Sequence, residues 1–286
     1  RPRHDMDRLL LLASVDGLVV GAAVGYFFLL DNTHLVEVRV HVDPAYRRRG
    51  VGRALAESLE ARARAAGRRT LASTVHGPVN EAGAGLEFAR AVGFVPANEE
   101  ETKVLDLTTA PQGWSVLADE VERKRADHVV HTFVDHVPDE HVAGVCALLS
   151  AFLDEAPSGE LDLERAEWTP ERLRAHEEQQ TAVGRRWLVA LAVAPDGTAC
   201  GFSELGFELG NPTRAEVGGT LVLPGHRGRR LGLGLKLATH RRLLELAPGC
   251  RVVSTTNAGV NAPMNAVNAR MGYRAVERAV DVQKVL

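Results

Sequence analysis

The order of apolar and polar positions predicts alternating strands and helices in the first third of the chain. Short apolar runs bounded by glycine, asparagine or aspartate indicate strands, whereas apolar residues three or four positions apart indicate helices. The expected strands are 9–15, 21–30, 35–42, 70–75 and 102–107. The expected helices are 51–66 and 85–91.

The same succession returns in the last hundred residues. The expected strands there are 187–193, 199–209, 216–222 and 251–255, and the expected helices are 233–246 and 263–270. A front section precedes them, and it has no counterpart earlier in the chain. It is expected to hold a strand at 129–134 and a helix at 139–153. A second helix is expected to open at Thr169-Pro170, with threonine as N-cap and proline in the first turn.

An internal repeat with an offset of 180 residues relates the two parts. Asp-Gly pairs at 16–17 and 196–197 each lie between apolar runs, which is the strongest short hairpin signal. In both parts a proline, Pro44 or Pro224, follows the glycine after 27 residues. The series of matches predicts two copies of one α/β unit.

The repeat sets the expected domain boundaries. Residues 1–107 form the first domain, residues 128–286 form the second, and residues 108–127 are interpreted as a linker because they hold proline, glycine and a run of charges. Because the strand pattern already begins at Leu9, we expect the first domain to lack its first elements.

Composition and charge narrow the class of protein. The chain is 45% hydrophobic and 25% charged with a net charge of −3, as in ordinary globular proteins, and this balance argues against binding to nucleic acid through bulk positive charge. The longest apolar stretch, 18–30, is shorter than the roughly 20 residues that span a bilayer. Cys146, Cys200 and Cys250 show no metal-ligand spacing, so we expect reduced thiols in a cytoplasmic protein without a metal site.

One loop carries candidate chemistry. The segment Arg-Arg-Arg-Gly-Val-Gly at 47–52 follows a predicted strand and opens a predicted helix. Glycines let the backbone approach a ligand, and the helix N-terminus offers free N–H groups to an anion. The arginines add charge-assisted contacts. The loop therefore suits a pyrophosphate, although a solvated basic turn has the same composition.

Two other nucleotide-binding motifs fit less well. A dinucleotide site of the Rossmann type needs Gly-x-Gly-x-x-Gly and a later acidic residue for the ribose, and neither is present. A Walker loop needs Gly-Lys-Ser/Thr, which does not occur. The loop pattern thus disfavours a nucleotide-dependent oxidoreductase.

The segment 40–52, Val-His-Val-Asp-Pro-Ala-Tyr-Arg-Arg-Arg-Gly-Val-Gly, resembles the acetyl-CoA loop of GNAT N-acetyltransferases. The stretch from Asn261 to Gly272-Tyr273 resembles the second motif of that family, an asparagine followed by an apolar helix that ends in Gly-Phe or Gly-Tyr. The chain is similar to tandem two-domain members of the actinobacterial type. The resemblance implies two tandem α/β domains, each with a mixed, mostly antiparallel sheet flanked by helices.

The resemblance also implies acetyl-CoA as the acyl donor and a set of residues that bind it. These are Val40, Val42, Arg47, Arg48, Arg49, Gly50, Val51, Gly52 and Arg53 in the first copy, and Val222, Arg227, Gly228, Arg229, Arg230, Leu231, Gly232 and Asn261 in the second.

Both copies depart from the family pattern. In the second copy, Arg230 stands where the loop expects its first glycine. In the first copy, the position that matches Asn261 is about Ala82. The tyrosine acid of many members is replaced by Asn268 in the second copy and by Ala89 in the first.

A general base is expected on the strand before the loop, because attack on the thioester needs a neutral amine. Counting back from the loop places Glu216 at this position in the second copy and Val36 in the first, with Glu37 one residue away and hence on the opposite face. Glu216 is the candidate catalytic residue. The alternative is a strand-edge carboxylate paired with Arg214 or another cation.

These observations favour an acetyl-CoA-dependent N-acyltransferase that acts on a primary amine of a small molecule by direct transfer in a ternary complex. One domain is expected to be inactive, and the chain to act as a monomer or homodimer without nucleic acid or membrane partners. The alternative is a non-catalytic CoA-binding or regulatory module, since both copies have lost motif residues.

Overall fold

The computed structural model describes residues 5–79, 81 and 83–286. The chain divides into two compact units, and each combines segments that are far apart in the sequence. Unit 1 contains residues 1–100, 158–165 and 277–286, whereas unit 2 contains residues 101–157 and 166–276.

Unit 1 is a five-stranded mixed sheet with the strand order β1-β2-β3-β4-β11. Pairing is antiparallel except between β3 and β4, which run parallel. Its strands are β1 (Met6–Val15), β2 (Leu18–Phe28), β3 (Leu35–Val42), β4 (Thr70–Gly77) and the larger part of β11 (Arg274–Val285). Its helices are α1 (Val51–Ala65) and α2 (Ala84–Ala91), with a short 3-10 helix, η1 (Pro44–Tyr46), before α1.

The core of unit 1 lies between its sheet and α1. The helical spacing of Leu55, Leu59 and Ala63 places all three side chains on one buried stripe, which packs against Val36 of β3. The opposite stripe of α1 carries charged residues and faces solvent. Burial of this single apolar face therefore fixes α1 on the sheet.

The last strand of the chain completes unit 1. Residues 278–285 of β11 pair antiparallel with β4, and Val280 and Val282 are buried in the core of unit 1. Conversely, β5 (Val95–Asp106) begins in unit 1, but its residues from Glu101 onward belong to unit 2. Each repeat thus supplies the closing strand of the other repeat's unit.

Unit 2 contains a mixed sheet with the order β5-β10-β9-β8-β7-β6, in which β9 and β10 run parallel while β6, β7, β8 and β9 pair antiparallel in succession. The strands are β6 (Val129–Val134), β7 (Arg185–Val193), β8 (Ala199–Glu208), β9 (Asn211–Val222) and β10 (Val252–Ala258). The helices are α3 (Trp114–Lys124), α4 (Asp139–Glu155), α5 (Pro170–Ala182), α6 (Leu231–Leu246) and α7 (Ala262–Met271). Short 3-10 helices, η2 (Ala110–Gly113) and η3 (Pro224–His226), precede α3 and α6.

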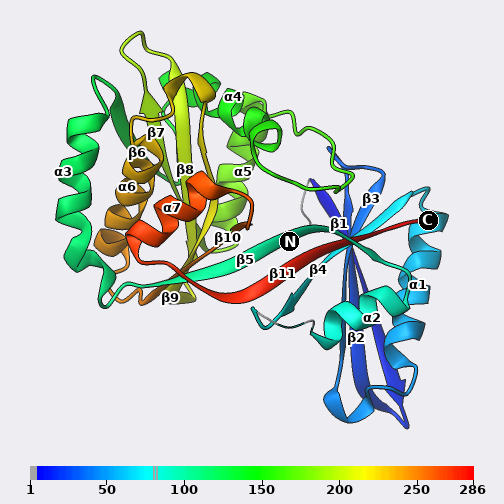
Figure 1. The fold of residues 1–286 in the computed structure, drawn as a ribbon. Helices are drawn as coiled ribbons and strands as arrows, with labels where there is room; N and C mark the ends of the chain where they lie inside the picture. The colour runs from blue at the N-terminus through cyan, green and yellow to red at the C-terminus, as the bar shows by residue number, and fades with distance from the viewer. Residues whose placement is uncertain (1–4, 80, 82) are drawn as a thin grey trace. The chain divides into compact units, whose positions relative to one another are not determined.

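Helices cover both faces of the unit 2 sheet (Figure 1). On one face α6 packs against β7, β8 and β9, with α3 and α7 beside it. On the other face α4 and α5 bury Trp187 and Val189 of β7 together with Phe202 of β8. Because successive residues of a strand point to opposite faces, the intervening Leu188 and Leu205 belong to the core under α6.

Residues 108–127, interpreted above as a linker, contain a helix that belongs to the core of unit 2. Trp114 and Val121 of α3 are buried, and α3 contacts α6 closely. A Cβ atom on Gly234 would lie 2.8 Å from a methyl carbon of Val121, so the glycine permits this approach.

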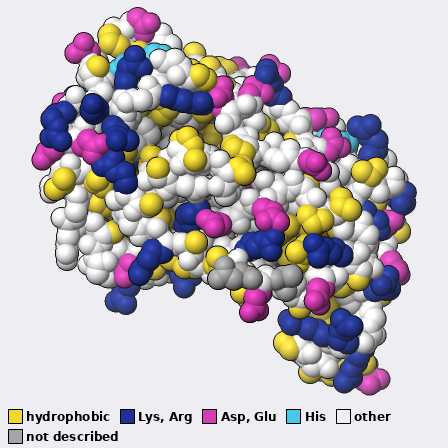
Figure 2. Space-filling model, viewed as in Figure 1, with side chains coloured by type: hydrophobic (Ala, Val, Ile, Leu, Met, Phe, Trp, Pro, Cys, Tyr) yellow, Lys and Arg dark blue, Asp and Glu magenta, His cyan; other side chains and the backbone are white. Residues whose placement is uncertain are grey.

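The fold class expected from the sequence is confirmed: each unit is a mixed, mostly antiparallel sheet flanked by helices. The expected N-cap at Thr169 is confirmed as well, since its side chain accepts a hydrogen bond of 3.2 Å from the Arg172 backbone N–H. In the described part of the chain, no helix is long and apolar enough to cross a membrane. On the face shown in Figure 2, basic and acidic side chains are interspersed.

The exchanged strand makes a prediction about stability. Val282→Ala should lower the free energy of unfolding by about 2 kcal/mol, because two buried methyl groups are lost and leave a cavity in unit 1. Val285→Ala, on the same strand but exposed, should change it by less than about 0.5 kcal/mol. Urea unfolding measures both, and amide exchange of β4 should accelerate only in the first variant. Equal effects of the two substitutions would contradict the assignment.

Candidate active site

The parallel pairing within each unit is short. In unit 1, β3 and β4 pair at only three positions, ending at Glu37 and Ala72, although β3 continues to Val42. In unit 2, β9 and β10 likewise pair at three positions, ending at Glu216 and Ser254, although β9 continues to Val222. Beyond these positions the two parallel strands are no longer paired to each other.

After the strand, the chain turns into a helix, and the backbone conformation of this turn is the same in both copies. The left-handed positions are Arg48 and Gly50 before α1, and Gly228 and Arg230 before α6. They correspond at the 180-residue offset, so the ungapped alignment of the two loops is correct. Each loop has one glycine and one arginine at these two positions, in opposite order. Arg230 therefore adopts the conformation that a glycine holds in the first copy, which an L-residue adopts at a cost of about 1–2 kcal/mol.

The first arginine of each loop ties it to the preceding strand. Arg47 Nε donates to the Val42 carbonyl at 3.1 Å, and Arg227 Nε donates to the Val222 carbonyl at 3.0 Å. Above Gly50, nothing lies within 4 Å of where a Cβ atom would be. The turn thus opens to solvent with the free N–H groups of the α1 N-terminus below it, and a phosphate group fits this concavity.

The extra arginine of the second loop has a partner of its own. Arg230 Nε donates to Glu120 Oε1 at 2.6 Å, and Arg270 also binds this carboxylate. The hydrogen bond from Arg270, reinforced by Arg230, holds the pKa of Glu120 at about 2. Arg230 is therefore drawn sideways toward α3, and Arg229 bonds the Gly225 carbonyl at 3.0 Å.

The second motif has a structural role in the described chain. Asn261 is the N-cap of α7, with its side-chain oxygen 3.2 Å from the Met264 backbone N–H. Asn268, where the family resemblance would place a tyrosine acid, is fully buried and accepts a hydrogen bond of 2.8 Å from Lys236 Nζ. Burial lowers the pKa of Lys236 to about 7. In the first copy, Ala89 is buried, and position 82 lies outside the described residues.

A β-bulge distinguishes the second copy. Gly218 and Gly219 of β9 both lie opposite Glu204 of β8, whereas β2 and β3 pair without interruption. Because β9 has this extra residue, the residues before the bulge correspond to residues of the first copy one position later than the sequence offset gives. Glu216 pairs with Gly206, and the equivalent pair in unit 1 is Glu37 with Tyr26. Glu37, and not Val36, is thus the counterpart of Glu216, contrary to the count along the sequence.

The two counterpart glutamates have different surroundings. Glu37 is hydrogen-bonded to Arg39 at 2.8 Å. Glu216 is exposed, and its carboxylate lies 3.7 Å from the guanidinium of Arg185. The expected partner Arg214 is not the one found, although the partner is a cation, as the alternative interpretation proposed.

Sequence reasoning missed Glu204, which lies on the same face of the sheet as Glu216. Its carboxylate accepts a hydrogen bond of 2.9 Å from the Trp187 indole N–H, and burial raises its pKa. A Cβ atom on Gly218 would lie 2.6 Å from Glu204 Oε1, so the glycine makes room for the carboxylate. The sequence signal was weak: a single glutamate in an apolar strand, opposite a Gly-Gly pair whose pairing register was unknown.

Comparisons with known proteins agree with the repeat. Residues 2–94 match the model of the acetyltransferase (GNAT) family. A solved tandem GNAT protein from the clavulanic acid biosynthesis pathway is 30% identical, with a TM-score of 0.79 over 99% of this chain and 84% of that chain. The GCN5-related N-acetyltransferase from Sphaerobacter thermophilus is 19% identical, with a TM-score of 0.67 over 94% of this chain and 78% of that chain. This similarity is one of fold. No curated protein matches the sequence significantly.

The half-buried Glu204 carboxylate predicts a pH dependence of stability. A raised pKa means that the folded protein holds the Glu204 proton more tightly than the unfolded chain, so stability falls as pH rises from about 4.5 through the raised value. Glu204→Gln removes this fall, and its stability advantage over the parent should grow from pH 4 to pH 8 in chemical unfolding. A difference in stability between Glu204→Gln and the parent that stays constant with pH would contradict the raised pKa.

Proposed function

Because the chain belongs to the GNAT family of acetyltransferases, we propose that it transfers an acetyl group from acetyl-CoA to a primary amine of a small molecule, in a ternary complex formed by unit 2. One observation carries the proposal. Unit 2 alone combines the open parallel strands, the strand-to-helix turn and a helix-covered sheet face with two carboxylates. Unit 1 has the turn, but the described chain contains no counterpart of α4 and α5 on it.

The two strand-to-helix turns would hold the CoA pyrophosphate. In each, a helix N-terminus presents backbone N–H groups, and arginines surround it with positive charge. In unit 1 the turn residues 47–53 are open to solvent apart from the partly buried Val51 and Gly52. In unit 2 the Glu120 carboxylate neutralises part of the charge on Arg230. We therefore assign CoA binding to both turns and catalysis to unit 2.

The acceptor would enter between the unit 2 sheet and α4 and α5. Glu216 and Glu204 both face this side, and a pair of carboxylates attracts an ammonium group and accepts its proton. Glu216 is the proposed base because it is exposed at the last paired position before β9 and β10 part. Glu204 lies deeper, opposite the bulge, and its raised pKa moves it toward the range useful for proton transfer.

The chemistry follows from these positions. A carboxylate takes a proton from the acceptor ammonium, and the free amine attacks the thioester carbonyl. The C–S bond then breaks, and the second proton lost by the attacking nitrogen converts the CoA thiolate to the thiol. Asn268 is an amide without an acidic proton, so the proposal gives it no part in protonating the leaving group. Correct positioning of the amine and the thioester then supplies much of the rate.

The base assignment predicts a change in turnover. Glu216→Gln should lower the turnover number at neutral pH by about 100-fold or more, because the ammonium loses its proton acceptor, and should leave CoA affinity nearly unchanged. Thiol release across a panel of small amines measures the rate.

The matched control is Glu37→Gln, which changes the counterpart glutamate of unit 1 and should retain full activity. Loss of activity in the control with full activity in Glu216→Gln would move the reaction to unit 1. If Glu204→Gln loses more activity than Glu216→Gln, the deeper carboxylate is the base.

The first turn predicts a loss of CoA binding. Gly50→Asp places a negative side chain where the pyrophosphate would lie, so CoA affinity at this turn should fall at least about tenfold, or about 1.4 kcal/mol. Calorimetric titration with CoA measures it. Gly17→Asp is the control, because Gly17 is also left-handed with open space around it but lies in the β1–β2 hairpin. Unchanged affinity in Gly50→Asp would show that the turn does not bind CoA.

A non-catalytic CoA-binding module is the second candidate. It is favoured by Arg230, which occupies the glycine position of the second turn, and by the buried amide of Asn268 at the acid position. CoA binding without thiol release from acetyl-CoA for any amine tested would support this function over the first.

A further inference from the structure

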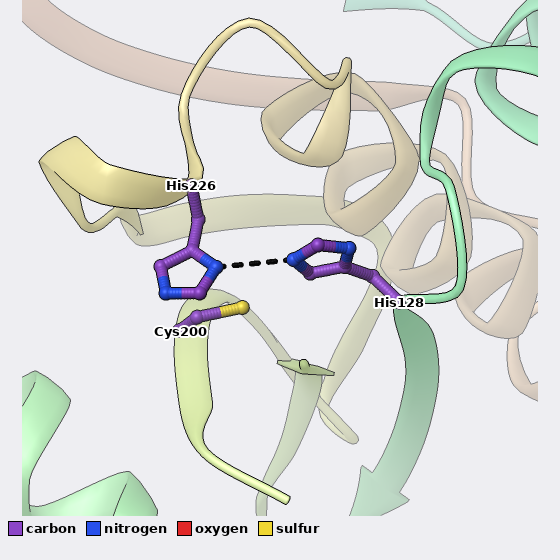
Figure 3. Close-up of side chains that lie close together, drawn as sticks. All are labelled: His128, Cys200 and His226. Atoms are coloured by element: carbon purple, nitrogen blue, oxygen red, sulfur yellow. Dashed lines mark hydrogen bonds between the residues drawn. The ribbon is translucent and has the colours of Figure 1, made fainter. Parts of the chain in front are cut away.

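Three side chains from separate segments of unit 2 lie close together (Figure 3). His128 precedes β6, Cys200 lies near the start of β8, and His226 ends the 3-10 helix η3 before the second turn. The Nε2 atom of His128 is 3.0 Å from Nδ1 of His226, a residue 98 positions later. Their nitrogen atoms and the Cys200 Sγ atom all lie within 4.8 Å of one another.

The hydrogen bonds of His128 fix which ring nitrogen carries the hydrogen. Its Nδ1 atom lies 2.9 Å from the carbonyl oxygen of Arg125, which can only accept, so Nδ1 carries the hydrogen. A metal ion would then bind through Nε2, the atom that points toward His226. A backbone carbonyl behind the ring is also the usual way in which proteins orient a metal-binding histidine.

The spacing of the three donor atoms suits one small ion. Zinc–nitrogen bonds are about 2.0–2.1 Å and zinc–sulfur bonds about 2.3 Å, so donors around a tetrahedral ion are about 3–4 Å apart. The two nitrogens already have this separation, and a modest rotation of the Cys200 or His226 side chain would bring the sulfur to it. His128 and Cys200 are buried while His226 is partly exposed, so the group is accessible from one side.

We propose that His128, Cys200 and His226 form a binding site for a divalent transition-metal ion of the zinc type. One thiolate with two imidazoles favours such an ion over magnesium or calcium, which prefer oxygen ligands. Binding releases the thiol proton to solvent, and three protein ligands leave one tetrahedral position for a water molecule. Among the described residues, no other cluster of three such donors has this geometry.

The ion would connect three segments that the backbone leaves separate. Its link from β8 to His226 would hold the turn that begins at Arg227, next to the proposed second pyrophosphate position. The metal site stands on its own donors and does not depend on the proposed acyl transfer.

The test uses untagged, full-length protein stripped with a chelator. Titration with Zn²⁺ against a chromophoric competitor should show one tight site per chain. Co²⁺ should give the intense near-ultraviolet band of cobalt–thiolate charge transfer together with the visible bands of tetrahedral coordination. Cys200→Ser should weaken Zn²⁺ affinity by at least about 100-fold, since loss of an outer-shell partner alone costs 10–100-fold. Cys250→Ser, which changes a buried thiol outside this cluster, should not change it.

A second variant keeps the test decisive if Cys200→Ser does not fold. His226→Gln changes the partly exposed ligand and should cause a similar loss of affinity, whereas His131→Gln in β6 should not. A Co²⁺ spectrum without the thiolate band, or Zn²⁺ binding unchanged in His226→Gln, would overturn the proposal.

Discussion

In each repeat, the parallel ladder ends after three residue pairs, and both candidate sites depend on that early end. Beyond Glu37 in unit 1 and Glu216 in unit 2, the parallel neighbours are no longer paired to each other. Among the described residues, no parallel strand pairing continues beyond these positions, and each strand leads directly into the turn before its helix. In the proposed function, a ligand would contact both the strand beyond the last parallel pair and the N–H groups at the helix N-terminus.

The two repeats have kept this scaffold and changed its parts. The two left-handed positions are occupied by arginine then glycine in one turn and by glycine then arginine in the other, so the backbone is preserved while the placement of charge differs. Only the second repeat has the bulge opposite Glu204, together with α4 and α5 over that face. These differences are the physical basis for assigning catalysis to unit 2. The exchange of the closing strands β5 and β11 also makes each unit depend on the other repeat's sequence.

Local sequence signals were sufficient for most elements and for the two turns. The Asp-Gly hairpins, the Thr169 cap and the apolar stripe of α1 act over a few residues, so their conformational preferences can be read directly from the sequence. The 180-residue offset was equally informative, because the same spacing produces the same turn in both copies. Position 230 has the left-handed conformation that its offset from Gly50 predicts, although its residue is an arginine, which disfavours that conformation.

What the sequence by itself determined is thus the repeated unit, its mixed sheet and the basic turns before two helices. Only the tertiary structure decided which strand closes which sheet, because strand pairing depends on partners far along the chain. It also decided that Glu37 is the counterpart of Glu216, since one bulged residue shifts the register of β9, and that Glu204 shares the face of Glu216. The convergence of His128, Cys200 and His226 was equally hidden, because donors from three segments have no spacing that a linear pattern can express.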